Sequence, residues 1–232
     1  MKKQLVRGLK DGIPIGLGYL SVSFGFGILA ASLGIAPLEA WLISATNLTS
    51  AGQVAGVGII AAAGSYLEMA ITQLVINIRY SLMGLSLSQK LDSTFHTPQR
   101  LLVSYGITDE IFAVAHAQEG KLTPPYMYGM ILVAFLGWTS GTFLGATAGE
   151  ILPRALTDAM GIMLYGMFLA IIIPAARENK GSLTVIVIAA VISILFYYIF
   201  TTVSGGFSII LSAVAAAALG AVLYPVDEEE VE

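Results

Sequence analysis

The chain has 232 residues, of which 56% are hydrophobic and only 11% are charged, and its mean hydropathy is +0.83. A soluble domain of this composition would lack enough polar surface to cover itself, so composition excludes an ordinary soluble protein. The formal net charge of −4 arises from an acidic C-terminal end. A basic stripe interleaved with aromatic residues would indicate a nucleic-acid partner, and the sequence contains no such stripe. The absence of cysteine excludes disulfides and thiolate metal sites.

Apolar segments occupy nearly the whole chain, and at about 20 residues per spanning helix there is room for seven or eight of them. Eight follow one another, at residues 13–35, 39–63, 64–88, 101–118, 126–149, 152–175, 183–202 and 207–224. The sequence therefore predicts an all-α fold, a polytopic transmembrane helix bundle with seven or eight membrane segments, some broken or re-entrant. We expect a single transmembrane transporter domain at residues 1–226 and an acidic disordered tail at residues 227–232.

The first segment is preceded by basic residues and is rich in glycine. Lys2, Lys3, Arg7 and Lys10 precede it, which indicates a retained helix with its N-terminus in the cytoplasm. Glycines in a spanning helix let another backbone approach closely. We expect this of Gly16, Gly18, Gly25 and Gly27, and of Gly137, Gly141 and Gly145 in the fifth segment.

The second segment is interrupted by polar residues between positions 46 and 53. Non-helical backbone at membrane depth is tolerated only where it lines a cavity or is buried in protein. Its free N–H and C=O groups can then bind a substrate carboxylate or ammonium. Asn47, Ser50 and Gln53 are the candidate side chains in this stretch, and a polar loop at the bilayer surface is the alternative.

The third segment carries Arg79, which stays charged and must find a carboxylate, carbonyl groups or water. Glu68 lies about three helical turns away on the same face, so it is too distant to be the direct partner. Asp109 or Glu110 can approach from another helix. A structural ion pair and a clamp for a substrate carboxylate both remain open.

The fourth segment is interrupted at Gly106, just before Thr108, Asp109 and Glu110. This pattern predicts a helix that begins here, with Thr108 as its cap and two acids in the first turn. Either carboxyl can also bind an ammonium group or carry a coupling proton. His116 lies on the face of Asp109, where it either extends a proton relay or is a hydrogen-bonded bystander.

The basic residues leave two membrane topologies open. The positive-inside rule places Lys121 in the cytoplasm, together with both chain ends. Either all eight segments cross, which puts Lys90 and Arg100 outside, or residues 38–63 and 101–119 are re-entrant or broken, which puts that connector inside. We favour the second, because it leaves fewer basic residues on the wrong side.

Nothing in the sequence indicates a catalytic site, a cofactor site or a metal site. The glycine-rich stretches lie inside an apolar run, with no strand before them and no lysine after them, so they do not bind nucleotide phosphates. No metalloprotease His–Glu pair and no serine elbow occurs. The chain is therefore not expected to be an enzyme.

Four short motifs together resemble the AzlC family, the large subunits of bacterial branched-chain amino-acid exporters. The motifs are Gly12-Ile13-Pro14-Ile15-Gly16, Ala51-Gly52-Gln53, Asn77-Ile78-Arg79 with Leu82-Met83, and Thr108-Asp109-Glu110. The resemblance implies an inner-membrane secondary transporter that exports leucine, isoleucine, valine or similar amino acids. It also implies a small AzlD-like membrane subunit as partner, and a neutral amino acid as substrate.

The resemblance and the residues together give one set of site candidates. Those for substrate binding are Asn47, Ser50, Gln53, Asn77 and Arg79, and those for proton coupling or ammonium binding are Asp109 and Glu110. Two departures affect substrate identity: Tyr80 stands where the family pattern leads us to expect histidine, and the stretch from Asn47 to Ser50 is unusually polar. The rival functions are a passive channel or uniporter, a membrane-embedded enzyme, and an assembly subunit without a pore.

Overall fold

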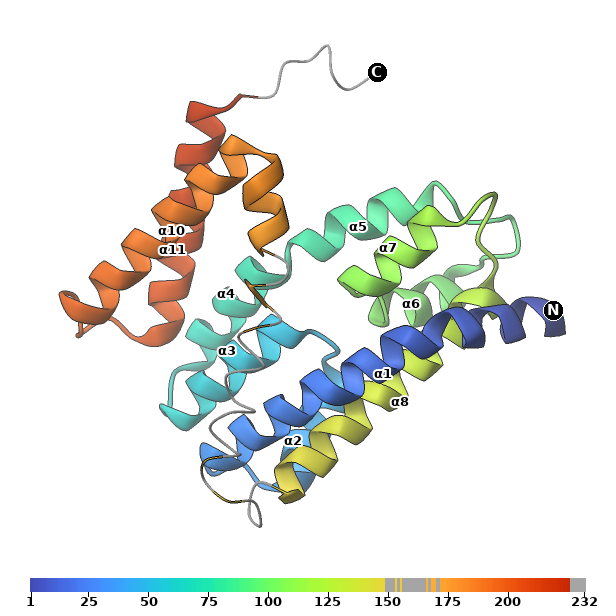
Figure 1. Ribbon diagram of the computed structural model, residues 1–232, viewed down its shortest axis with the longest axis horizontal. Coiled ribbons are helices and arrows are strands. Elements are labelled where there is room, and N and C mark those ends of the chain that lie inside the picture. The colour runs from blue at the N-terminus through green and yellow to red at the C-terminus, as the bar shows by residue number, and fades with distance from the viewer. Residues whose placement is uncertain (149–152, 154, 156–165, 167, 170–171, 226–232) are drawn as a thin grey trace. The chain divides into compact units, whose positions relative to one another are not determined.

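In the computed structural model, every named element is a helix (Figure 1). The structure describes residues 1–148, 153, 155, 166, 168–169 and 172–225. The predicted tail at 227–232 and most of the sixth segment, 152–175, lie outside this part of the chain. Among the described residues, four helices are long and apolar enough to cross a membrane: α1 (Lys2–Ser32), α8 (Pro124–Ala148), α10 (Lys180–Tyr198) and α11 (Gly205–Leu223). The all-helical membrane class is confirmed, and the number of segments stays a prediction.

The helices gather into two compact units. Unit 1 comprises Met1–Val57 and Asn77–Leu164, and unit 2 comprises Gly58–Ile76 and Tyr165–Glu232. The expectation of a single transporter domain at residues 1–226 stays a prediction.

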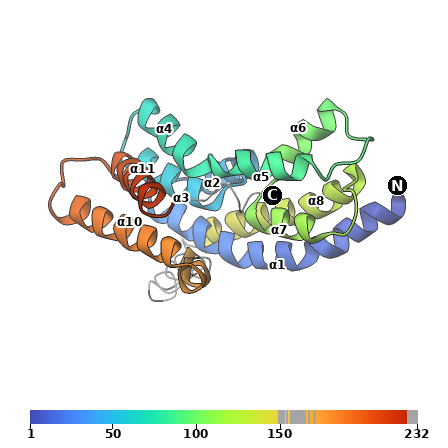
Figure 2. The same cartoon turned by 90° about the horizontal axis from the view of Figure 1, so that it is seen from above.

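In unit 1, α1 and α8 pack against each other along their length and run in the same direction (Figures 1 and 2). A Cβ atom added to Gly8 would lie 2.0 Å from the carbonyl oxygen of Tyr126. One added to Gly27, near the other end of α1, would lie 2.2 Å from the carbonyl oxygen of Thr142. The two backbones are therefore in direct contact, which only glycine permits at these positions.

The predicted close approach at the glycines is confirmed at five positions. An added Cβ would fall within 3 Å of the partner helix's backbone at Gly16, Gly27, Gly137, Gly141 and Gly145. Gly25 is also buried. The expectation was wrong for Gly18, where an added Cβ would meet no atom within 4 Å. Gly18 lies on the side of α1 that faces away from α8.

Three of the predicted segments are each divided into two short helices. The pairs are α2 (Pro37–Thr46) with α3 (Ser50–Ala61), α4 (Tyr66–Asn77) with α5 (Arg79–Ser88), and α6 (Thr97–Tyr105) with α7 (Asp109–Ala117). The non-helical residues 47–49 and 106–108 lie where polar residues and Gly106 predicted interruptions. The division at Ile78 was not predicted, since residues 64–88 read as one continuous helix.

The buried core of unit 1 lies where α7 and the ends of α5 and α6 pack on α1 and α8. Its members come from positions far apart in the sequence and include Tyr19, Leu87, Ile111, Met127, Met130 and Trp138. This packing places the interruption at residues 106–108 beside the middle of α1 and α8.

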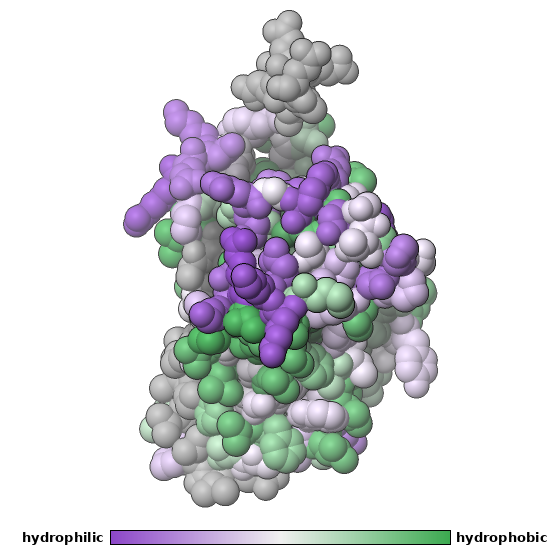
Figure 3. All heavy atoms as spheres, turned by 90° about the vertical axis from the view of Figure 1, so that its right-hand side faces the viewer, coloured by the Kyte–Doolittle hydropathy of each residue, from purple (hydrophilic) through white to green (hydrophobic). Residues whose placement is uncertain are grey.

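The start of α1 and two connecting loops lie at the same end of unit 1. The Lys90 ammonium donates to the carbonyl oxygen of Gln118 at 2.6 Å, and that of Lys121 donates to the carbonyl oxygen of Gln89 at 2.7 Å. The Arg7 guanidinium donates to the side chain of Gln118. Hydrophilic side chains gather over this end of unit 1 (Figure 3). Both ends of the α6–α7 pair therefore lie at this end, as the re-entrant topology expects, while the count of complete crossings stays a prediction.

In unit 2, α10 and α11 form an antiparallel hairpin (Figure 2). Asn179 begins α10, because its side-chain oxygen accepts hydrogen bonds from the N–H groups of Gly181 at 2.7 Å and Ser182 at 3.2 Å. Ser204 caps α11 in the same way. The buried Glu68 carboxylate of α4 accepts hydrogen bonds from the Ser204 hydroxyl and from the N–H of Gly206, so it joins α4 to the start of α11.

Candidate functional site

The start of α7 brings two acidic side chains to the interruption after α6. The Thr108 hydroxyl accepts a hydrogen bond from the N–H of Ile111 at 3.4 Å, which confirms Thr108 as the predicted cap. Asp109 and Glu110 therefore occupy the first turn of α7, where the helix dipole stabilises negative charge. The local sequence alone explains this placement.

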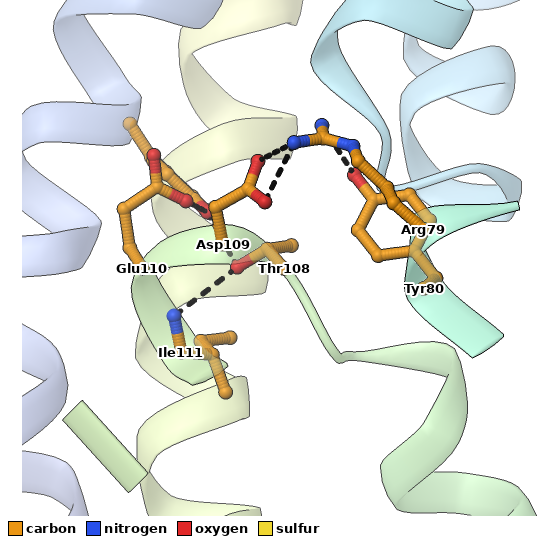
Figure 4. A network of polar contacts seen from close by, with 7 residues as sticks. Arg79, Tyr80, Thr108, Asp109, Glu110 and Ile111 are labelled. Atoms are coloured by element: carbon orange, nitrogen blue, oxygen red, sulfur yellow. Dashed lines mark hydrogen bonds and ion pairs between the residues drawn. The ribbon is translucent and has the colours of Figure 1, made fainter. Parts of the chain in front are cut away.

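Asp109 pairs with Arg79, the first residue of α5 (Figure 4). The guanidinium Nη1 lies 2.7 Å from both carboxylate oxygens of Asp109. Nη2 donates to the Tyr80 hydroxyl at 3.5 Å, and the guanidinium carbon lies 5.0 Å from the centre of the Tyr80 ring. The predicted pairing is confirmed for Asp109. The two side chains remain 40% and 28% exposed, so the ion pair is accessible to a small solute.

Glu110 points away from Arg79 and contacts α1 instead (Figure 4). Its carboxylate accepts a hydrogen bond from the hydroxyl of Tyr19, which also lies 2.6 Å from the Thr108 oxygen. Tyr19 is buried at 6% exposure in the middle of α1. The two neighbouring acids therefore differ in surroundings, since Asp109 faces a cation and Glu110 faces a neutral hydroxyl.

Gln53 lies in a buried chain of hydrogen bonds next to this cluster. Its carbonyl oxygen accepts from the Trp138 indole N–H at 2.8 Å, and its amide nitrogen donates to the Ser44 hydroxyl at 2.9 Å. The Ser44 hydroxyl lies 2.7 Å from that of Thr142. With 1% exposure and both ends of the amide bonded, Gln53 joins α2, α3 and α8 in this conformation. Its substrate contact stays a prediction.

Two aromatic side chains connect these polar groups. The rings of Tyr19 and Trp138 meet edge to face, with centroids 5.1 Å apart. The acidic turn at Glu110 is thereby linked through Tyr19 and Trp138 to Gln53. Neither aromatic residue was identified from the sequence as part of the site. A tyrosine or tryptophan within a spanning helix could have indicated them, because its O–H or N–H needs a polar partner when it is buried.

The other candidates lie apart from the Arg79–Asp109 pair or at its margin. Asn47 and Ser50 are half-buried at the gap between α2 and α3, where the Asn47 side-chain oxygen accepts from the Thr49 hydroxyl at 3.1 Å. Asn77 is half-buried at the end of α4. His116 stacks on the Phe112 ring, with ring centres 5.3 Å apart, at the exposed end of α7. Their proposed roles stay predictions.

Within the part of the chain that the structure describes, no three His, Asp or Glu side chains converge to hold a metal ion. The described polar groups near the middle of unit 1 instead include the Arg79 guanidinium, the Asp109 and Glu110 carboxyls, the Gln53 amide and several hydroxyls. This set can bind a small solute that carries both charges, and it can hold a proton on a carboxyl.

The sequence matches one family over the region that contains this cluster. The family described as AzlC protein matches residues 14–152. The inner membrane protein YgaZ of Escherichia coli is 31% identical over 187 residues, which cover 78% of this chain and 76% of YgaZ. The chain belongs to the AzlC family. The resemblance found from the four motifs is thereby confirmed.

Other AzlC relatives are more distant or lack a described activity. An uncharacterized membrane protein of Archaeoglobus fulgidus is 31% identical over 72% of this chain and 74% of its own length. The branched-chain amino acid transport protein AzlC of Bacillus subtilis is 22% identical over 72% of this chain and 66% of its own length. No solved structure matches the chain.

The AzlC match begins inside α1, continues through α8 and ends before the α10–α11 hairpin. Every candidate site residue lies inside it. Tyr80 stands where the family pattern led us to expect histidine. In the structure it contacts the Arg79 guanidinium by both its ring and its hydroxyl.

Proposed function

We propose that this AzlC-family protein is an inner-membrane secondary transporter that exports branched-chain or similar neutral aliphatic amino acids. The observation that carries the proposal is the accessible Arg79–Asp109 ion pair. An amino acid carries a carboxylate and an ammonium group, so it can insert between the two side chains and replace each partner with its own opposite charge. A solute with only one charge would leave one of the two side chains without a partner.

The name of one relative supports this substrate class, and the name of another supports the membrane location. The Bacillus subtilis relative is named a branched-chain amino acid transport protein, and YgaZ is named an inner membrane protein. We extend both descriptions to this chain, with a small AzlD-like membrane subunit as its partner. The basic residues at the end of unit 1 that holds the start of α1 support a cytoplasmic N-terminus.

Liposomes test the transport directly. The protein is reconstituted with and without a small partner subunit, and counterflow of labelled leucine, valine, methionine and a charged control is followed at several pH gradients. We expect exchange of the neutral aliphatic amino acids and accumulation against a gradient. Flux without accumulation would favour the channel or uniporter, a chemical product would favour the enzyme, and no exchange of any neutral amino acid by folded protein would refute the proposal.

Glu110 is the proposed carrier of the coupling proton, because Arg79 pairs with Asp109 while the Glu110 carboxyl contacts the neutral hydroxyl of Tyr19. Glu110→Gln keeps an oxygen that accepts from the Tyr19 hydroxyl but cannot ionise. We expect the variant to lose pH-driven accumulation of leucine while it keeps counterflow at equal pH on both sides. Glu119→Gln, an exposed acid in the loop after α7, is the matched control. Unchanged pH-driven accumulation by Glu110→Gln would exclude Glu110 as the proton carrier.

A further inference from the structure

A pocket that opens to the surface lies in unit 1, between α5, α6 and the start of α8. Its volume is about 130 Å³, and it is lined mainly by apolar side chains that also belong to the buried core: Leu87, Phe95, Val103, Ile107 and Met127. Its floor consists of these core residues, and its rim includes the exposed residues Arg100 and Ser104, so a solute can enter from the surface and contact apolar side chains. An apolar cavity of similar volume, about 150 Å³, is known to bind benzene. A branched aliphatic side chain is no larger than benzene.

One cation lines the same pocket. Arg100 lies in the first half of α6, and among the ion pairs of the described residues none includes it. A guanidinium binds a carboxylate through two parallel hydrogen bonds. The hydroxyls of Ser88 and Ser104, which also line the pocket, donate to carbonyl oxygens of their own helices and keep lone pairs free to accept from an ammonium.

The pocket lies at the end of unit 1 where α1 begins. Leu91, another lining residue, pairs through its backbone with Leu122, beside the Lys90 and Lys121 contacts that define this end. The Arg79–Asp109 pair lies at the opposite end of α5. The pocket is therefore distinct from that pair and closer to the basic surface.

We propose that this pocket is a loading site for an aliphatic carboxylate of about the size of leucine. The apolar lining holds the branched side chain, and Arg100 holds the carboxylate. The inference rests on the proposed function, in which a branched-chain amino acid is captured at the basic, cytoplasmic end before it reaches Arg79 and Asp109. An aliphatic carboxylate can also come from a fatty acid, so the experiment separates the two sources.

Equilibrium binding in nanodiscs tests the pocket apart from transport. The background is the Arg79→Gln/Asp109→Asn variant, in which the ion pair no longer binds a zwitterion, and saturation-transfer NMR reports weak binding of leucine. We expect residual leucine binding that weakens about tenfold on Arg100→Gln, which removes a charge-assisted interaction. Val103→Phe fills the pocket and should have a similar effect. In otherwise unaltered protein, both changes should raise the KM for leucine and leave the maximal rate within about twofold.

The matched controls make the same kinds of substitution, loss of a positive charge and enlargement to phenylalanine, at residues outside the pocket. Lys3→Gln removes a positive charge at the same end of unit 1, and Leu102→Phe enlarges an exposed neighbour of Val103 on α6. Both should bind leucine as the background does. Leucine binding that is unaffected by Arg100→Gln and Val103→Phe would overturn the proposal. So would decanoate binding that depends on Arg100 when leucine binding does not. Absence of transport by the unaltered protein would refute the proposed function, while the binding result would still decide the pocket.

Discussion

Leucine counterflow is expected to fall about a hundredfold or more in each of two variants, Arg79→Gln and Asp109→Asn. Each change removes one of the two charges that an inserted amino acid would contact, and it also leaves the other charge without its partner at 2.7 Å. The measurement is the initial rate of counterflow in liposomes, with equal amounts of folded protein verified by size-exclusion chromatography.

The double variant Arg79→Gln/Asp109→Asn separates binding from structure. Replacement of both members of an ion pair by neutral groups is often tolerated, because no unpaired charge is left behind. If the pair only stabilises the fold, the double variant should regain transport. If the pair binds substrate, the double variant should stay inactive although it is stably folded, and this is the result we expect.

Asp11→Asn is the matched control for the ion-pair variants. It neutralises the partner of Arg7 in a looser pair at 3.9 Å, at the exposed end of α1, and keeps an oxygen that accepts from the Tyr126 hydroxyl. Exposed pairs of this kind contribute little, so its counterflow should match that of the unaltered protein. Normal counterflow in Arg79→Gln would contradict the proposed site.

Gly137→Ala is expected to destabilise the protein by at least about 3 kcal/mol, which corresponds to a melting temperature roughly 10 °C lower. The added Cβ would lie 2.2 Å from the carbonyl oxygen of Gly16, and backbone cannot move aside as a flexible side chain can. The α1–α8 contact would have to open along part of its length. Thermal unfolding in detergent, followed by circular dichroism or by aggregation, measures the effect.

Gly18→Ala is the matched control on α1. An added Cβ there meets no atom within 4 Å, so only intrinsic helix preference changes. Alanine favours a helix over glycine by about 1 kcal/mol, so this variant should melt at the same temperature or slightly higher. If Gly137→Ala melted like Gly18→Ala, the close backbone contact between α1 and α8 would be refuted.

Parts of the site could be predicted because their causes are local or follow from charge. A threonine before two acids, after a glycine, has the spacing of a helix start, and Thr108 caps α7 as that spacing requires. Arg79 could be expected to pair with a carboxylate, because a guanidinium in a membrane segment has few other stabilising partners. Glu68 was excluded as that partner on the assumption of one continuous helix; the structure divides that segment at Ile78, and the Glu68 carboxylate accepts from Ser204 and Gly206 instead.

Other parts could not be predicted because they depend on packing between distant segments. Tyr19 and Trp138 are 119 positions apart in the sequence and meet only because α1 and α8 run side by side. Gln53 was predicted to bind substrate, yet whether its amide stays available depends on Ser44 and Trp138. The difference between Gly16 and Gly18 depends on which side of α1 faces α8, and the sequence does not mark that side.

The sequence by itself determined that this chain is a helical membrane protein of the AzlC family, and where two of its segments are interrupted. Hydropathy, helix capping and the cost of a charge in hydrocarbon act locally, so they can be read along the chain. Only the tertiary structure decided that Asp109, and not Glu110, pairs with Arg79, and that Glu110 contacts Tyr19. Successive residues in a helical turn point about 100° apart, so the positions of neighbouring helices determine which acid meets the cation.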